Sequence, residues 1–358
     1  MKYSQVKLVN LFFLIFCMLL FACEQAPKRV LGDYFSNRAT RCTSKELKID
    51  SLFIGFPGGI VLVDSLLIIS DTYAGMHFSL VDIKNKKMLK RFGSKGKGPN
   101  EFMLKNYMHI IQKNGTFQFF ALNEKKQFIY SITDLVEVEN PVPKEIIDLS
   151  VEKDQGSYST VVPYGNNKFI GNGWFYSGKY AITEAGGKLD TIIGSYHIDQ
   201  SLTDVNNYVL GDLFQGGITL NPTGDKLAYF SISCDLIEVV DLKSDKVFEK
   251  RQFHTYVPMF EFRNNRLTLK RNNPFGFSVF CATTKYLYAL YSGKDLSKGR
   301  QFLSGSSLLY VFDWNLNPIK AYRLDKETWN IAASEDDKTL YTIVESEQLS
   351  LAAYSLSH

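Results

Sequence analysis

Short apolar runs separated by polar turns fill the chain from about residue 45 to its end. The runs are rich in β-branched and aromatic residues and are too short for most helices, so they predict β-strands. In the first pair, residues 60–63 and 66–69 flank the turn at Asp64 and Ser65. Asp, Asn and Gly recur in such turns because tight hairpins need positive φ or local hydrogen bonds to the backbone. The pattern predicts an all-β protein built of hairpins.

The hairpins recur at a regular spacing. Their turns lie, at steps of 50, 52, 58, 60 and 53 residues, at Ser65, Gly115, Asn167, Asp225, Lys285 and Lys338. A second strand pair follows in several units, at residues 78–82 and 88–92, 236–241 and 247–248, and 308–313 and 319–322. Four strands in each of six units predict a six-bladed β-propeller with four-stranded antiparallel blades.

The last unit lacks a fourth strand, because the chain ends soon after residues 350–354. Residues 46–50 alternate between polar and apolar positions and can supply it. An N-terminal strand in the last blade would close the ring and cover an exposed sheet edge. A β-sandwich or two small β domains is the alternative, but neither accounts for the steady step between hairpins.

A targeting segment precedes this body. Lys2 and Lys7 form a short basic region, and residues 8–20 are apolar except for Asn10. The run is shorter than the roughly 20 apolar residues that a transmembrane helix needs. It predicts a signal peptide rather than a membrane span.

The sequence Leu-Phe-Ala-Cys at residues 20–23 resembles a bacterial lipobox, although Phe21 is bulkier than usual. The Cys23 sulfur would carry a diacylglycerol thioether, and the small Ala22 would permit cleavage directly before it. An ordinary secretory signal is the alternative, but Leu20 fits that cleavage pattern poorly. We expect a signal peptide at 1–22, a lipidated tether at 23–44 and a propeller domain at 45–358.

This organisation predicts a lipid-anchored protein of the bacterial outer membrane. The N-terminal lipid would be its contact with the membrane. No acidic run follows Cys23, so we favour the periplasmic side over the cell surface.

Net charge and cysteine content indicate which partners and which cysteine chemistry to expect. The 358 residues include 41 Lys and Arg against 37 Asp and Glu, a net charge of +4, which gives no reason to expect nucleic acid as a partner. The mature chain beyond the lipid site keeps Cys42, Cys234 and Cys281, whose spacing is typical of neither a metal site nor a redox pair. We expect buried free thiols rather than a disulfide between Cys234 and Cys281.

Several motifs resemble one family. The turns at residues 221–229 and 334–341 resemble the Ser-Pro-Asp-Gly-Lys-x-Leu-Tyr turn of TolB-like propellers. Residues 92–102 (Phe-Gly-Ser-Lys-Gly-Lys-Gly-Pro-Asn-Glu-Phe), residues 290–293 and Cys23 resemble the TolB-like six-bladed propeller lipoproteins of Bacteroidetes. The resemblance covers essentially the whole mature chain and implies the fold and an envelope location. It implies no catalytic residues.

Motifs that carry chemistry are scarce. Residues 92–102 are rich in glycine, but Pro99 stands where a Walker loop needs Lys followed by Ser or Thr. We interpret them as a connection between blades; an anion-binding nest with Lys95 and Lys97 is the alternative. The five histidines form no HxH or HExxH pattern, and no GxSxG or EF-hand loop occurs. The sequence predicts no local metal site.

Loops at one mouth of a propeller channel are the expected place for a ligand. The candidate ligand-binding residues on these loops are Tyr73, His77, Trp174, Tyr176 and Arg300, because large amphipathic side chains and arginine dominate binding energies. Alternatively, Trp174 and Tyr176 cover a blade core, and His77 is a hydrogen-bonded structural histidine. A basic cluster is expected to be a solvated loop rather than an anion site; its members are Arg263, Arg266, Lys270 and Arg271.

These observations favour a lipid-tethered binding or scaffolding module for a protein, peptide or glycan over an enzyme. The alternative is a metal-dependent lactonase or hydrolase with a calcium ion at the channel mouth. Its candidate oxygen ligands are Asp71, Asn123, Asn172 and Asp235. A structural role in envelope assembly rests on fold analogy alone. Apart from such a calcium ion, we expect no cofactor.

Overall fold

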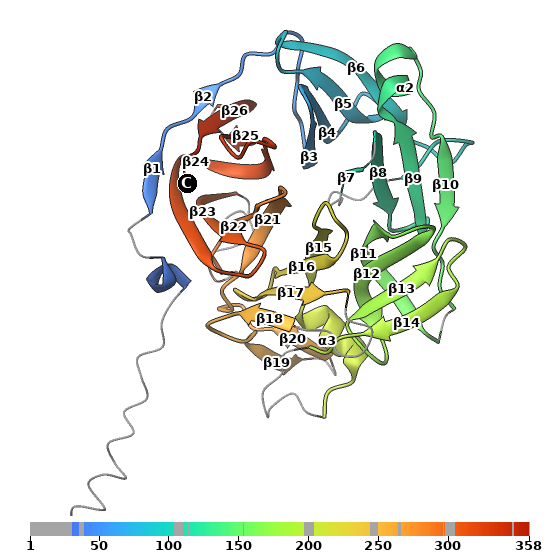
Figure 1. Cartoon of the computed structure of the whole chain (residues 1–358), viewed down its shortest axis with the longest axis vertical. Helices are drawn as coiled ribbons and strands as arrows, with labels where there is room; N and C mark the ends of the chain where they lie inside the picture. Colours follow the sequence, from blue (N-terminus) through green and yellow to red (C-terminus); the bar gives the residue numbers. More distant parts are fainter. Residues whose placement is uncertain are drawn as a thin grey trace, which may run out of the picture.

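The computed structural model describes residues 31–35, 39–103, 110–113, 115–152, 154–196, 204–243, 250–263, 266–295, 297, 305–345 and 347–357. Strands dominate these residues and form mainly antiparallel sheets. Figure 1 shows the sheets arranged as a ring, and each four-stranded sheet has its first strand toward the centre and its last toward the rim. The predicted six-bladed propeller with four-stranded antiparallel blades is confirmed.

Blades 1 to 4 each contain four consecutive strands. Blade 1 contains β3 (Pro57–Val63), β4 (Leu66–Tyr73), β5 (Met76–Asp82) and β6 (Lys87–Ser94). Blade 2 contains β7 (Ile110–Lys113), β8 (Thr116–Ala121), β9 (Lys126–Ser131) and β10 (Glu145–Asp148). Blade 3 contains β11 (Gly156–Tyr164), β12 (Lys168–Phe175), β13 (Tyr180–Glu184) and β14 (Leu189–Ile193). Blade 4 contains β15 (Gly216–Leu220), β16 (Lys226–Ser231), β17 (Ile237–Asp241) and β18 (Lys250–Phe253).

Blades 5 and 6 share one long strand. Blade 5 contains β21 (Phe277–Ala282), β22 (Tyr286–Tyr291), β23 (Ser306–Asp313) and the first part of β24 (Pro318–Ala333). Blade 6 contains the rest of β24, β25 (Thr339–Glu345), β26 (Leu349–Ser355) and β2 (Lys45–Glu46). Tyr322 of β24 pairs with Leu309 of β23, and Ile331 pairs with Thr342 of β25. The two blades therefore form one continuous sheet.

The hairpin turns lie at the positions predicted from the sequence. Asp64, Asn167 and Asp337 have φ of 53°, 56° and 60°, and Gly224 has φ of 71°. These residue types tolerate the left-handed backbone that joins the first two strands of a blade. In blade 2, Gly115 of the predicted turn has φ of 70° and directly precedes β8.

An N-terminal strand completes blade 6, as predicted, but it is β2 rather than residues 46–50, and Asp50 instead bridges to Lys87 of blade 1. In β2, Lys45 pairs with Ala353 and Glu46 pairs with Ala352, antiparallel to β26. The amide of Leu47 continues the ladder with a 2.8 Å hydrogen bond to the carbonyl of Leu351. Strand β2 covers the edge that β26 would otherwise expose.

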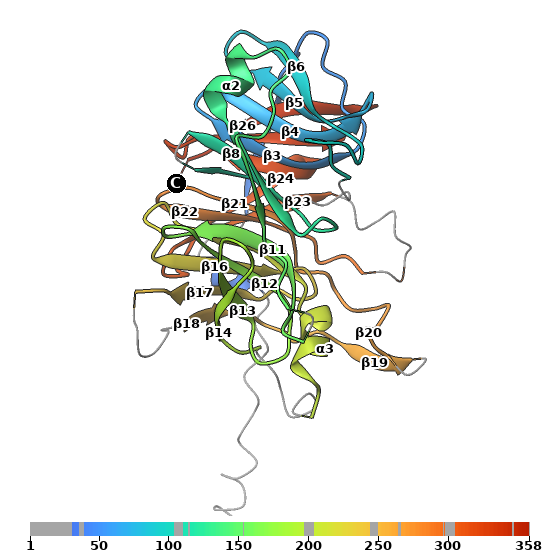
Figure 2. The same cartoon turned by 90° about the vertical axis from the view of Figure 1, so that its right-hand side faces the viewer.

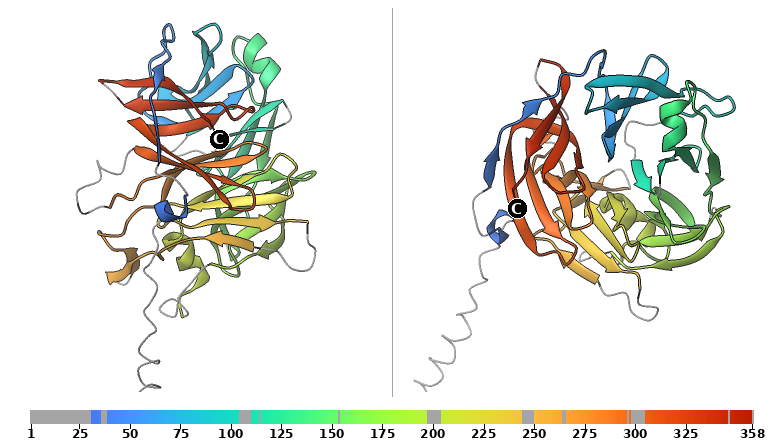
Figure 3. Two further views of the ribbon diagram at one scale, coloured as in Figure 1. Left: turned by 60° about the vertical axis from the view of Figure 1, so that its left-hand side comes forward. Right: turned by 45° about the horizontal axis from the view of Figure 1, so that its top comes forward.

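The segment before β2 packs on the body, whereas the sequence suggested a tether over residues 23–44. It contains a 3₁₀ turn, η1 (Leu31–Tyr34), and β1 (Thr40–Cys42), which pairs in parallel with β24. Figure 3 shows β1 along the outer side of that sheet. Leu31 and Phe35 are buried in a core shared by blades 4 and 5, and Phe35 stacks on Tyr310 at 4.7 Å between ring centroids.

Short elements between the strands project from the two faces of the ring (Figure 2). Helix α2 (Ile132–Glu137) lies on one face, with Ser131 as its N-cap. Helix α3 (Asn207–Leu213) lies on the other, with Asn206 as its N-cap. On the same face as α3, β19 (Phe260–Arg263) and β20 (Arg266–Leu269) form an extra hairpin between blades 4 and 5.

Aromatic rings fill the core between blades 1 and 2. Phe78, Phe92 and Phe102 are almost fully buried there, with several aromatic residues of blade 2. Gly93 has φ of 75°, and a Cβ atom at this position would lie 2.8 Å from Phe102 and 2.9 Å from Phe78. Only glycine fits here without displacing the core.

Cys42, Cys234 and Cys281 are free thiols, as expected. Burial raises the pKa of Cys234 to about 11 and that of Cys281 to about 12. Both are therefore protonated and unreactive at neutral pH. Among the described residues, the helices are too short and too polar to cross a membrane.

Candidate functional site

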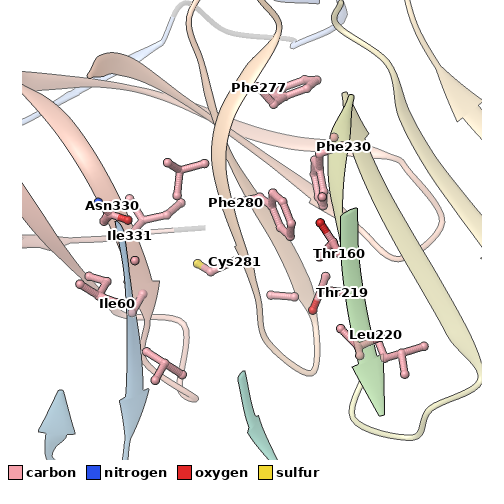
Figure 4. A pocket seen from close by; sticks show the side chains of 18 of the residues that line it. Ile60, Thr160, Thr219, Leu220, Phe230, Phe277, Phe280, Cys281, Asn330 and Ile331 are labelled. Atoms are coloured by element: carbon pink, nitrogen blue, oxygen red, sulfur yellow. The ribbon is translucent and has the colours of Figure 1, made fainter. Parts of the chain in front are cut away.

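A cavity of about 1170 Å³ runs through the centre of the ring. The first strands of five blades line it among the described residues, with glycine, threonine, serine and apolar side chains. Figure 4 shows Phe230 and Phe280 on one wall and Ile60 and Ile331 on another. Among the described lining residues only Glu335 is charged. This wall suits neutral groups rather than a charged substrate or a metal ion.

The oxygen ligands expected for a channel-mouth calcium ion do not come together. The Asp71 carboxylate accepts hydrogen bonds from the amides of Gly55 and Phe56 and lies 3.7 Å from Arg91. The Asp235 carboxylate accepts from the amides of Thr255 and Tyr256. Both carboxylates thus serve to fix neighbouring loops.

The two asparagines are also apart. The Asn172 amide donates to the carbonyl of Gly216, which ties blade 3 to blade 4, and Asn123 is exposed in the turn between β8 and β9. Within the described ranges, no three His, Cys, Asp or Glu side chains come close enough to hold a metal. None of these four residues lines the cavity.

Three exposed aromatic side chains gather at one mouth of the cavity, and we call them the aromatic ledge. They are Phe53, Phe56 and Tyr73, with exposed fractions of 49%, 48% and 44%. Phe53 and Tyr73 are in contact, with ring centroids 4.7 Å apart. Phe56 lines the cavity mouth. The aromatic ledge therefore extends from blade 1 to the mouth of the channel.

Arg91 and Asp71 hold the ledge in place. The Arg91 guanidinium lies 4.7 Å from the centre of the Tyr73 ring and donates a 2.6 Å hydrogen bond to the carbonyl of Phe53. Asp71, with 1% of its surface exposed, accepts 3.1 Å and 2.7 Å bonds from the amides of Gly55 and Phe56. The aromatic rings are thus ordered before any partner arrives, which lowers the entropy cost of binding.

Of the residues singled out in the sequence, Tyr73 belongs to the ledge, but Phe53, Phe56 and Arg91 were missed. Phe53 and Phe56 lie in an irregular segment before β3, where the strand pattern is absent. Two phenylalanines in a loop rich in glycine and proline were the available signal. Arg91 looked like an ordinary strand residue.

His77 is not available to a ligand, which corrects its place among the candidates. Its exposed fraction is 1%, and its ring stacks on Phe102. Nδ1 lies 2.9 Å from the Thr72 hydroxyl, and Nε2 lies 2.9 Å from the carbonyl of Phe102. Burial lowers the pKa of His77 below its usual value. The alternative, a structural histidine, is what the geometry supports.

Trp174 and Tyr176 lie on the same face as the ledge, over blade 3. The Trp174 ring nitrogen donates a 2.5 Å hydrogen bond to Asp212, so this side chain packs against α3. Tyr176 is 50% exposed and stacks on Tyr208 at 5.1 Å between ring centroids. Neither lines the described cavity. Arg300 and Cys23 lie outside the described residues.

Residues 92–102 connect β6 to blade 2. The Glu101 carboxylate accepts a 2.8 Å hydrogen bond from the amide of Gly98 and lies against Gly96. Phe102 enters the aromatic core. The protein's own carboxylate therefore occupies the place that an anion would take, which argues against the alternative of a phosphate nest.

The fold and this site define a class: a six-bladed β-propeller with exposed aromatic side chains at one mouth of its central channel. The chain belongs to the TolB-like six-bladed propeller family, since the family described as TolB-like 6-blade propeller-like matches residues 35–336. The sequence resemblance is confirmed. A search of curated proteins gave no match.

Two solved structures from Bacteroides share the fold. A member of the DUF4221 family from Bacteroides vulgatus is 10% identical, with a TM-score of 0.52 over 89% of this chain and 98% of that chain. A protein of Bacteroides fragilis described as exported is 13% identical, with a TM-score of 0.54 over 88% of this chain and 95% of that chain. At these identities the likeness shows the fold alone, and this fold supports a binding or scaffolding module.

Proposed function

We propose that this protein is a lipid-anchored binding module of the cell envelope, which recognises a protein or peptide through the aromatic ledge. The observation that carries the proposal is the ordered cluster of Phe53, Phe56 and Tyr73 beside Arg91 at the cavity mouth. Exposed aromatic residues grouped with arginine are the side chains that contribute most to protein interfaces.

The ledge favours a protein or peptide over a glycan. Phe53 and Phe56 offer apolar surface without a hydrogen-bonding group, and Arg91 is already bonded to the Phe53 carbonyl. A glycan needs several polar partners for its hydroxyl groups, whereas an apolar side chain of a peptide needs only the rings. The neutral cavity beside Phe56 can accept such a side chain.

Site-specific photo-crosslinking in the native envelope tests this function. A photoreactive residue at Phe53 should give a discrete adduct with one protein. Val142, which is 55% exposed on the face that carries α2, is the matched control and should give no such adduct. Tyr73→Ala should reduce the yield about 30-fold or more, as expected for a central aromatic contact. The same adduct from Phe53 and Val142, or no adduct from Phe53, would refute the ledge as the binding site.

The proposed envelope location rests on observations other than the aromatic ledge and needs a separate experiment. The lipobox at residues 20–23 favours acylation of Cys23, and the structural neighbour from Bacteroides fragilis is described as exported. Labelling cells with radioactive palmitate should mark the wild-type protein but not Cys23→Ser. Protease added to intact cells should leave the protein intact if it faces the periplasm.

A further inference from the structure

The basic cluster at residues 263–271 is part of a β-hairpin, not the solvated loop that the sequence suggested. Strands β19 and β20 pair antiparallel, with Phe260 opposite Leu269 and Arg263 opposite Arg266. The hairpin is additional to the four strands of blade 4. Figure 2 shows it projecting beyond the blades on the face that carries α3.

One face of the hairpin is apolar and extends past the body. Phe260 and Phe262 are two residues apart and lie opposite Leu269 and Leu267, so the four side chains share a face. Phe260, Leu267 and Leu269 pack against the core of blades 3 and 4 and α3. Phe262 does not, and its exposed fraction of 73% is the largest of any large apolar side chain in the described structure.

The same hairpin is strongly cationic. Residues 260–271 include two arginines in the strands, a lysine and an arginine after them, and a single acidic residue, which gives a net charge of +3. Arg263, Lys270 and Arg271 are exposed. The chain from residue 24 onward has a net charge of +2, so the part of it outside this segment has a net charge of −1. Positive charge is therefore concentrated beside the protruding Phe262.

The base of the hairpin is rigid. The buried Asn273 side chain accepts a 2.7 Å hydrogen bond from the amide of Met259 and donates a 2.8 Å bond to the carbonyl of Ser233. The amide of Lys270 donates to the carbonyl of Met259 at 2.9 Å. The hairpin is thus held in its projecting position by blade 4.

The hairpin and the N-terminal segment lie toward the same edge of the ring. Tyr34 of η1 contacts Phe253, the last residue of β18, with ring centroids 4.6 Å apart. The hairpin follows β18 after six residues. Blade 1, which carries the aromatic ledge, lies at the opposite edge (Figures 1 and 2).

We propose that the β19–β20 hairpin binds the surface of a bilayer that contains anionic phospholipid, with Phe262 inserted among the headgroups and Arg263, Lys270 and Arg271 beside lipid phosphates. A protruding apolar side chain on a cationic hairpin is the arrangement that such a surface favours. A protein partner would require a broader apolar surface than one ring, and Phe260, Leu267 and Leu269 are already partly buried against the core. This contact goes beyond the proposed function and does not depend on a lipid at Cys23.

Sedimentation with vesicles tests the contact directly. The chain from residue 24 onward contains every described element but no lipid, so any binding comes from the protein surface. It should bind vesicles of phosphatidylethanolamine and phosphatidylglycerol, and should not bind vesicles of phosphatidylethanolamine and phosphatidylcholine. Each cation near an anionic surface contributes about a five-fold gain in binding. The triple variant Arg263→Gln/Lys270→Gln/Arg271→Gln should therefore bind on the order of 100-fold more weakly.

Matched variants on blade 1 separate a local contact from general charge. Lys84→Gln/Lys86→Gln/Lys87→Gln removes the same charge from exposed residues at the opposite edge and should lose only the weaker, long-range attraction. Phe262→Ala should weaken binding about ten-fold, whereas Val142→Ala, at an exposed position on the face that carries α2, should leave it unchanged. Absence of binding to phosphatidylglycerol vesicles, or an equal loss in the two triple variants, would overturn the proposal. Crosslinking from the ledge fails or succeeds independently of this result.

Discussion

The Lys179 ammonium lies 3.4 Å from a carboxylate oxygen of Glu238, and both side chains are fully buried. The pair joins blade 3 to blade 4. The Tyr180 hydroxyl donates a 2.8 Å hydrogen bond to the same carboxylate oxygen, and the Tyr229 ring lies 3.4 Å from the ammonium. Charge that is buried this deeply must be neutralised by its immediate neighbours.

Loss of one partner of this pair should therefore destabilise the protein severely. Glu238→Gln leaves the Lys179 ammonium without a counter-charge and should lower the free energy of unfolding by about 3–5 kcal/mol. The double variant Lys179→Met/Glu238→Leu should recover much of that loss, because it removes both charges. Urea denaturation measures both. Asp190→Asn, which breaks the exposed pair with Lys168, is the control and should have little effect.

A buried neutral histidine should make the protein less stable as the pH falls. Burial lowers the pKa of His77, so the unfolded chain binds a proton at higher pH than the folded chain does. The unfolded state then holds more protons, and the free energy of unfolding decreases as the pH drops below about 6.5. Urea denaturation between pH 8 and pH 5 should show this slope, and His77→Gln should flatten it. An equal slope in the variant would show that other groups cause it.

Two glycines with similar backbones should respond differently to substitution. Gly75 has φ of 78° with nothing within 4 Å of an added Cβ atom, whereas Gly93 has φ of 75° with two aromatic rings within 3 Å. Gly75→Ala should cost about 1–2 kcal/mol from backbone strain alone. Gly93→Ala should cost about 1–3 kcal/mol more, because it also overpacks the core. Equal thermal denaturation midpoints for the two variants would contradict this account.

The ledge should become mobile when its carboxylate support is removed. Asp71→Asn keeps the size of the side chain but gives up one acceptor oxygen and the charge facing Arg91. We expect a loss of about 1–3 kcal/mol in stability and new chymotrypsin cleavage after Phe53, since the bond after Phe56 precedes Pro57 and resists this protease. Asp82→Asn removes an exposed carboxylate that caps the turn between β5 and β6 of the same blade, and it should leave the cleavage pattern unchanged.

The hairpin turns could be predicted because their chemistry is local. Asp64, Asn167 and Asp337 have positive φ, and their residue types alone indicate it, because Asp and Asn tolerate the left-handed backbone of a tight turn. The continuous β24 could not be predicted, because the step from blade 5 to blade 6 depends on pairing with strands on both sides. The docking of Leu31 and Phe35 also depends on a distant core that a short segment does not reveal.

The site was harder to predict for the same physical reason. His77 looked like a ligand candidate because its partner, the Phe102 carbonyl, is 25 residues away and arrives through the connection to blade 2. The ledge depends on Arg91 reaching Phe53 across 38 residues. A loop aromatic residue is visible in the sequence, but its exposure is decided by which strand ends surround it.

If Cys23 carries the proposed lipid, the N-terminal segment determines how far the propeller can move from the membrane. Eight peptide steps separate Cys23 from the buried Leu31, a reach of about 28 Å at most. If residues 31–44 came free, the reach to Lys45 would be about 75 Å. Leu31→Ala/Phe35→Ala should release this segment, because it removes the side chains that fill the core of blades 4 and 5.

Hydrogen exchange distinguishes a docked segment from part of the cooperative core. In the double variant, amides of residues 31–35 should exchange at least about ten-fold faster, while the strands of blade 1 keep their protection. Val142→Ala, at an exposed position, is the control and should change neither region. A uniform rise in exchange across all blades would instead mean that η1 is needed to hold the ring together. The segment that contains η1 would then determine the stability of the propeller rather than its distance from the membrane.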